Sequence, residues 1–92
     1  MLAAFVLIDA EPARVADLAS ELADVEGVAE VYSVAGDCDI IAIVRVRRHD
    51  DLAEVVTRRI AALPGIVATR TMVAYKAYSE RDLAALWDLG AD

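Results

Sequence analysis

The segment Ser-Val-Ala-Gly-Asp-Cys-Asp-Ile-Ile-Ala-Ile-Val-Arg-Val-Arg, residues 33–47, predicts the end of one strand, a tight turn and a long second strand. In the turn, Gly36 tolerates a positive φ, and the side chains of Asp37 and Asp39 can bond nearby backbone N–H groups. The strand that follows is apolar on both faces, with Ile40, Ala42, Val44 and Val46 on one and Ile41 and Ile43 on the other. Because a strand of this kind is usually covered on both sides, we expect a layer on each face of its sheet.

Composition and charge narrow the class of protein. The chain has 92 residues, enough for one domain, and 59% of them are hydrophobic, a surplus that we assign to an interface between subunits. A net charge of −7 argues against direct binding of nucleic acid or of an anionic membrane surface. The single cysteine excludes an intramolecular disulfide, and the apolar start is too short for a signal peptide or membrane span. We therefore expect a cytoplasmic protein.

Hydrophobic periodicity and breaker residues predict the remaining elements. Strands are expected at 2–9, 28–34, 39–47 and 66–75, and helices at 12–24 and 51–63, with Asp50 as the N-cap of the second helix. A last short helix is expected to begin at Ser79 and to present Leu83, Leu86 and Trp87 as an apolar patch. The chain thus divides into a domain at 1–78 and a helix and tail at 79–92.

The two halves of the domain repeat. An offset of 38 residues aligns Leu18 with Val56, Leu22 with Ile60, Val25 with Leu63, Gly27 with Gly65 and Val28 with Ile66. Two successive β-α-β units with right-handed crossovers predict an α+β ferredoxin-like sandwich, with both helices on one face of an antiparallel sheet. The other face has no cover within the chain. We expect two such sheets to pair face to face as a dimeric α+β barrel, through Phe5, Leu7, Ile41 and Ile43.

The turn is the best candidate for a ligand site. Backbone N–H groups of a glycine turn can hold a carboxylate, and aspartate can accept hydrogen bonds from an ammonium group. The candidate binding residues are Ser33, Gly36, Asp37, Cys38, Asp39, Thr69 and Thr71. The residues alone also fit an ordinary hairpin turn whose aspartates cap the backbone, and threonine is a favoured strand residue in any case. Arg70, on the opposite strand face from the two threonines, is assigned an ion pair with an acidic residue of a neighbour, with a ligand carboxylate as the alternative.

Three motifs together resemble the effector-binding domain of the Lrp/AsnC transcription regulators. They are the hairpin 34–40, the helix end and Leu-Pro-Gly-Ile at 60–66, and the strand Thr-Arg-Thr-Met-Val at 69–73. The resemblance covers residues 5–76 and implies a homodimer, a larger ring such as an octamer, and an amino-acid effector bound between dimers near the turn. Two departures stand out: Cys38 replaces a common aromatic, and Met1 opens directly on the first strand, where the family has a helix-turn-helix. The chain thus resembles the stand-alone members, which would affect transcription through a full-length relative.

We therefore predict a non-catalytic sensing and oligomerisation module, without cofactor or metal. His49 is the only histidine, and Cys38 has no identifiable base, so we find no catalytic constellation. A small monooxygenase-like enzyme of the same dimeric barrel topology is one alternative, and it would require a polar cavity between helices and sheet. An ACT-like regulatory domain is another, but it would pair sheets edge to edge and leave the two-sided strands uncovered.

Overall fold

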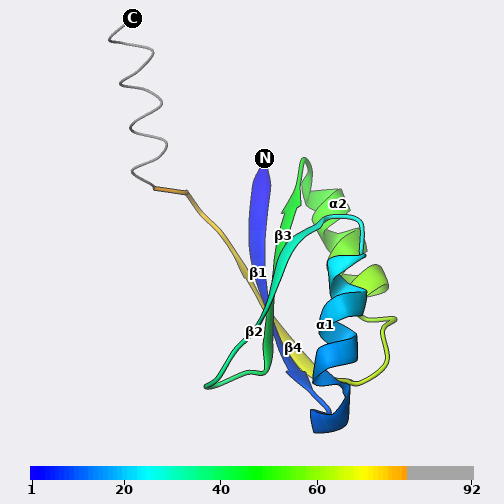
Figure 1. Cartoon of the computed structure of the whole chain (residues 1–92). Helices are drawn as coiled ribbons and strands as arrows, with labels where there is room; N and C mark the ends of the chain where they lie inside the picture. Colours follow the sequence, from blue (N-terminus) through cyan, green and yellow to red (C-terminus); the bar gives the residue numbers. More distant parts are fainter. Residues whose placement is uncertain (79–92) are drawn as a thin grey trace, which may run out of the picture.

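The computed structural model describes residues 1–78, which form a four-stranded antiparallel sheet with its helices on one face (Figure 1). The order of the strands across the sheet is β2-β3-β1-β4. The elements are β1 (Leu2–Ala10), η1 (Pro12–Arg14), α1 (Val15–Ala23), β2 (Val28–Ser33), β3 (Ile40–Val46), α2 (His49–Glu54), η2 (Val55–Ile60) and β4 (Ile66–Val73). The predicted α+β ferredoxin-like fold is confirmed. The helix expected from Ser79 lies outside the described residues.

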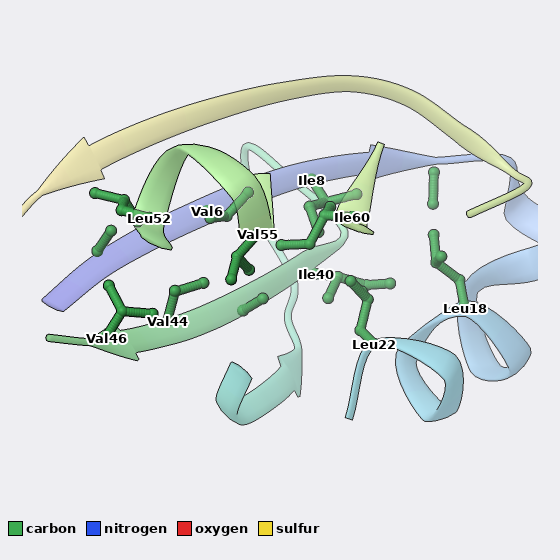
Figure 2. Packing of buried hydrophobic residues seen from close by; sticks show 13 residues of the cluster. Val6, Ile8, Leu18, Leu22, Ile40, Val44, Val46, Leu52, Val55 and Ile60 are labelled. Carbon is green, nitrogen blue, oxygen red and sulfur yellow. The ribbon is translucent and has the colours of Figure 1, made fainter. Parts of the chain in front are cut away.

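The core lies between the helices and one face of the sheet (Figure 2). Alternate residues of the two central strands point into it, because successive side chains of a strand face opposite ways. The buried cluster consists of Ala4, Val6, Ile8, Ala10, Leu18, Leu22, Ile40, Ala42, Val44, Val46, Leu52, Val55 and Ile60. None of the described residues with a polar or charged side chain is buried. The stripes predicted from periodicity at Leu18, Leu22, Leu52 and Ile60 are therefore the ones that build this core.

The second helix differs from the prediction at both ends. It begins at His49, with Arg48 in the N-cap position and no side-chain cap, so Asp50 lies in the first turn and the prediction that it is the N-cap was wrong. The last six residues, Val55–Ile60, form a π-helix. Within it, the Thr57 hydroxyl donates to the Ala53 carbonyl at 2.6 Å. In an α-helix that carbonyl would accept from the Thr57 N–H, so the hydroxyl offers it a second donor where the helix widens.

Each helix is followed by a glycine with a positive φ, at +99° for Gly27 and +95° for Gly65. Each glycine is also crowded by a residue of the other half of the chain. A Cβ on Gly27 would lie 2.6 Å from Cγ2 of Val55, and a Cβ on Gly65 would lie 2.8 Å from Cβ of Arg14. Both positions therefore require glycine for two reasons: another residue would be strained at this φ, and its Cβ would clash with the neighbouring side chain.

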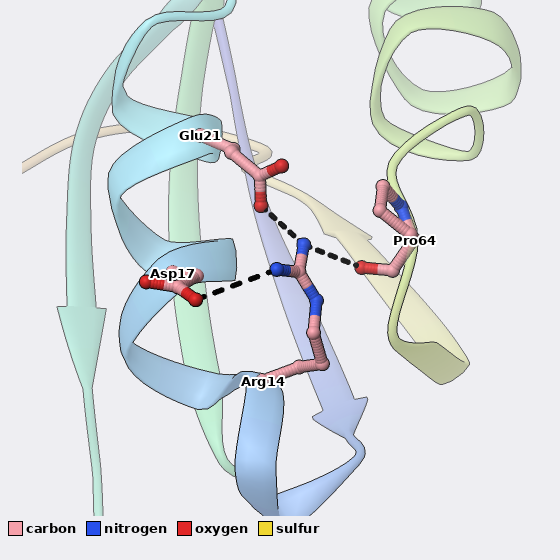
Figure 3. Close-up of polar contacts among 4 residues, drawn as sticks. All are labelled: Arg14, Asp17, Glu21 and Pro64. Atoms are coloured by element: carbon pink, nitrogen blue, oxygen red, sulfur yellow. Dashed lines mark hydrogen bonds and ion pairs between the residues drawn. The ribbon is translucent and has the colours of Figure 1, made fainter.

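Arg14 joins the start of the first helix to the connection that precedes β4 (Figure 3). Its guanidinium donates to Glu21 and, at 3.3 Å, to the Pro64 carbonyl, and it forms an ion pair of 3.6 Å with Asp17. In the same place, the Glu11 N–H donates to the Gly65 carbonyl at 2.8 Å. These contacts fix the path of the chain into β4, the strand that carries Thr69, Arg70 and Thr71.

The sheet face opposite the helices is uncovered in the described chain. Phe5 lies across from Ile43 on one side and Met72 on the other, and Leu7 lies across from Ile41 and Arg70. Phe5 is 37% exposed and Met72 54% exposed, and a third large side chain on this face, Tyr32, is 53% exposed. The open face therefore presents a contiguous apolar surface of the kind that marks an interaction site.

Candidate functional site

The turn between β2 and β3 projects from the sheet on the side away from the helices (Figure 1). Its base is closed by a hydrogen bond of 2.9 Å from the Val34 N–H to the Asp39 carbonyl. Gly36 has a φ of +132°, and no atom lies within 4 Å of the place where its Cβ would be. The glycine is therefore needed for the backbone conformation alone, and the surface above the turn is open to a ligand.

Asp39 fastens this turn to the end of β1. Its N–H donates to the Ile8 carbonyl at 3.0 Å, and its Oδ2 accepts from the Ala10 N–H at 2.8 Å. The bond to Ala10 falls beside the bulge at Asp9 and Ala10, where the pairing of β1 with β4 shifts its register. One carboxylate oxygen of Asp39 is thus engaged by the backbone, which gives the residue a structural role.

Replacing Asp39 by alanine is expected to lower the free energy of unfolding by about 1–3 kcal/mol, because the half-buried Ala10 N–H loses a charged acceptor. Urea unfolding followed by circular dichroism measures this change. Asp39→Asn keeps an acceptor at the same place and should lose clearly less. Equal losses for both variants would contradict the hydrogen-bond assignment.

Arg70 contacts the turn, which the sequence did not predict. Its Nη2 donates to the Asp37 carbonyl at 3.3 Å. Because β1 lies between β3 and β4, the turn leans across the end of β1 to make this contact. Among residues 1–78, no carboxylate lies within ion-pair distance of Arg70, so its ion pair with an acidic residue of a neighbour stays a prediction. A guanidinium with spare donors thus stands beside exposed Asp37.

The other candidate residues are Cys38, in the turn itself, and Ser33, Thr69 and Thr71, in the two edge strands. Cys38 is 6% exposed, so little of its side chain is open to a ligand. Ser33, Thr69 and Thr71 pair with Ile40, Ile8 and Val6, so their side chains share the helix face of the sheet, where the edge strands leave them exposed. The predicted site residues therefore form two groups within one subunit. The turn and Arg70 lie on the open face, and Ser33, Thr69 and Thr71 lie on the other.

The described part of the chain has neither a metal-binding cluster nor a membrane-spanning helix. Among residues 1–78, no three His, Cys, Asp or Glu side chains gather in a way that could hold a metal ion. His49 is exposed at the start of α2. No helix in this range has the length and apolar character needed to cross a membrane.

The sequence matches the family model of the Lrp/AsnC ligand binding domain over residues 3–84, and the chain belongs to this family. Among curated proteins it is 32% identical over 77 residues to the HTH-type transcriptional regulator FL11 of Pyrococcus abyssi. That alignment covers 84% of this chain and 50% of the regulator, so the chain spans about half the length of the curated relatives it matches. The chain is thus a ligand-binding regulatory domain whose homologues are transcriptional regulators.

Solved structures share the fold. The protein TTHA0845 of Thermus thermophilus superposes with a TM-score of 0.81 at 43% identity, over 86% of this chain and 99% of that chain. A transcriptional regulator of Neisseria meningitidis, NMB0573, was solved as a complex with L-Met. It superposes with a TM-score of 0.75 at 14% identity, over 85% of this chain and 52% of that chain, which shows a common fold alone.

Proposed function

We propose that this chain is a non-catalytic sensor that binds a free amino acid, or a related small metabolite, at the turn between β2 and β3. The observation that carries the proposal is the guanidinium of Arg70 held 3.3 Å from the Asp37 carbonyl, beside a glycine turn with an exposed aspartate. An α-amino acid needs an anion receptor and a cation receptor close together. The turn N–H groups and Arg70 supply the first, and the Asp37 carboxylate supplies the second.

The comparisons support a small ligand of this class. The matching family model describes a ligand-binding domain, and one structure of the same fold contains L-Met. The alternative of a barrel enzyme needs a polar cavity between the helices and the sheet. In residues 1–78 the interior of that space holds buried apolar side chains, and a pocket lined by charged residues lies at its rim, beside the end of β3.

The proposed assembly is a homodimer through the open sheet face, and a ring of dimers such as an octamer. The division of the candidate residues into two groups favours a site between copies. Arg70 belongs to the edge strand β4 and the turn projects at the end of the sheet, so both lie at the rim of the paired face. There a neighbouring dimer can bring its Ser33, Thr69 or Thr71, which lie on the other face of their own subunit. Ligand would then shift the assembly equilibrium by its different affinities for the two states. An effect on transcription would pass through assembly with a full-length relative.

The direct test is light scattering of the protein with and without each of the twenty amino acids, followed by calorimetry on those that change the mass. We expect a multiple of the dimer mass that responds to one or a few of them. A plain monomer would contradict the proposed assembly. A large assembly that binds none of the panel would contradict the proposed ligand class.

Arg70→Gln is expected to lower the affinity for the amino acid that binds most tightly in that panel by roughly ten- to a hundredfold. The reason is the loss of a charged hydrogen bond to the carboxylate of that amino acid. Isothermal calorimetry measures the affinity. Arg58→Gln removes the same charge from an exposed position on η2 and should leave the affinity unchanged. If both variants bind alike, Arg70 is not the carboxylate receptor.

A further inference from the structure

The chain leaves the sheet soon after β4 ends. The Ala74 N–H still donates to the Ala3 carbonyl at 2.8 Å and so continues the pairing with β1. Residues 75–78 do not follow β1 further, and no backbone hydrogen bond joins them to another described residue. Figure 1 shows the chain departing here on the side away from the helices, where the turn between β2 and β3 also projects. We call residues 75–78 the arm.

The arm carries two aromatic side chains that are almost free of contacts. Tyr75 is 105% exposed and Tyr78 is 81% exposed. Lys76 places its Nζ 5.2 Å from the centroid of the Tyr78 ring, a cation–π contact within the arm itself. A tyrosine can bury about 150–250 Å² of surface, and tyrosine is enriched among the residues that dominate protein interfaces. An extended segment with two such side chains is typical of an element that packs against a partner.

The place where the arm begins favours a second copy of this chain as that partner. The arm leaves from the rim of the open sheet face, next to the exposed side chain of Met72. Packed sheets lie about 10 Å apart. Four extended residues span up to about 13 Å, at about 3.3 Å per residue. The arm is therefore long enough to cross from its own sheet to a sheet packed on the open face.

Charge distinguishes the two edges of the partner's sheet. The arm has one charged side chain, Lys76, and a second copy carries a net charge of −7. On the open face, the edge strand β4 carries Arg70, which repels a lysine, and the edge strand β2 carries Glu30, which attracts it. The Glu30 side chain is 43% exposed and lies 3.8 Å from Arg45. It also accepts from the Tyr32 hydroxyl at 2.7 Å, which leaves some of its roughly four acceptor positions open.

The outer edge of β2 is also free to pair. This strand lies at one end of the order β2-β3-β1-β4, so among the described residues its outward N–H and C=O groups have no strand beside them. An extended segment can add to such an edge as a further strand, with backbone hydrogen bonds and side-chain contacts. The arm has the free backbone groups that this pairing requires.

We propose that the arm crosses to a second copy of this chain and lies along the outer edge of its β2. Tyr75 and Tyr78 pack on Tyr32 of the partner subunit, and Lys76 pairs with the partner's Glu30. Two-fold symmetry repeats the exchange, so each subunit gives one arm and receives one. The inference rests on the face-to-face dimer proposed above, and it adds that the β4 edge of one sheet lies beside the β2 edge of the other.

The test detects contacts between copies only. A nitroxide spin label is attached at Ala77→Cys in a Cys38→Ala background, and this protein is mixed with ¹⁵N-labelled protein that carries no nitroxide. Broadening of the ¹⁵N-labelled copy then comes only from a label on another copy. We expect the amide signals of residues 30–32 to be lost and to return when the nitroxide is reduced. The same label at Ala53→Cys, exposed on α2, should leave these signals unchanged.

The possible results separate this proposal from the proposed assembly. Loss of signals from β4 in place of β2, or no loss at all, overturns the placement of the arm. If the mass is that of a dimer and no signal is lost, the arm proposal fails alone and the dimer stands. A monomer mass contradicts both the arm and the dimer.

Two variants test the side chains of the arm. Tyr78→Ser is expected to weaken dimerisation by roughly tenfold. Lys76→Glu should weaken it by roughly threefold or more, because it places a second carboxylate beside the partner's Glu30. Sedimentation velocity over a dilution series measures the dimerisation constant, and circular dichroism checks that each variant is folded. Arg58→Glu makes the same change of charge on η2 and should leave the constant unchanged. Equal constants for Lys76→Glu and Arg58→Glu would overturn the pairing with Glu30.

Discussion

Phe5→Lys is expected to convert the protein from a dimer, or a multiple of dimers, into a folded monomer. Phe5 lies at the centre of the open sheet face, between Ile43 and Met72. Phe5 is 37% exposed in the single subunit, so burying the rest contributes about 0.5–1 kcal/mol. A two-fold interface would also take in two lysine charges, at several kcal/mol for each one buried without a partner, so dimerisation weakens by at least about 10²-fold. Sedimentation velocity at several protein concentrations measures the change.

The matched control for Phe5→Lys is Ala53→Lys. Ala53 is exposed on α2, in the layer that covers the other face of the sheet, and lysine is a good helix former. This variant adds the same charge and should keep the parent mass. Circular dichroism of both variants checks that the fold is intact. An unchanged mass for Phe5→Lys would show that the open face is not the dimer interface.

Gly27→Ala is expected to lower the free energy of unfolding by about 2–4 kcal/mol. Part of this, about 1–2 kcal/mol, is the cost of a side chain at a φ of +99°. The rest is overpacking, because the new Cβ would lie 2.6 Å from Cγ2 of Val55, which is held in the core. Thermal and urea unfolding of the parent and the variant measure the loss.

Gly36→Ala separates these two contributions. Gly36 also has a positive φ, +132°, but no atom lies within 4 Å of the position that a Cβ would take, so only the backbone cost remains. We expect a loss of about 1 kcal/mol. If the two alanine variants were equally destabilised, the close packing of Gly27 against Val55 would not contribute to stability.

The sequence was sufficient for the fold because its strongest signals are periodic. The alternate facing of successive side chains in β3, whose two faces are both apolar, and the helical spacing at Leu18, Leu22 and Ile60 show which residues of an element share a face. The repeat of 38 residues, marked by Gly27 and Gly65, then determined the order of the elements. The same alternation correctly placed four residues on one face, because paired residues of neighbouring strands lie on the same side of the sheet. They are Phe5, Leu7, Ile41 and Ile43.

The features that the sequence did not reveal depend on contacts between distant elements. Arg70 reaches Asp37 only because β4 lies beside β1 and the turn leans across β1, and neither fact has a local signal. The separation of Thr69 and Thr71 from the turn follows from the same arrangement. The π-helix that follows α2 contains a bond from the Thr57 hydroxyl to the Ala53 carbonyl, and hydrophobic periodicity carries no signal for either feature.

The interleaving of the two halves has a consequence for how the protein unfolds. The order β2-β3-β1-β4 alternates strands of the first and second β-α-β units, so each unit alone would lack the strand between its own two. The glycine after each helix also packs on a residue of the opposite unit, Gly27 on Val55 and Gly65 on Arg14. Neither unit therefore has a core or a sheet of its own, and the domain should unfold in one cooperative transition, with no populated intermediate that retains a single half.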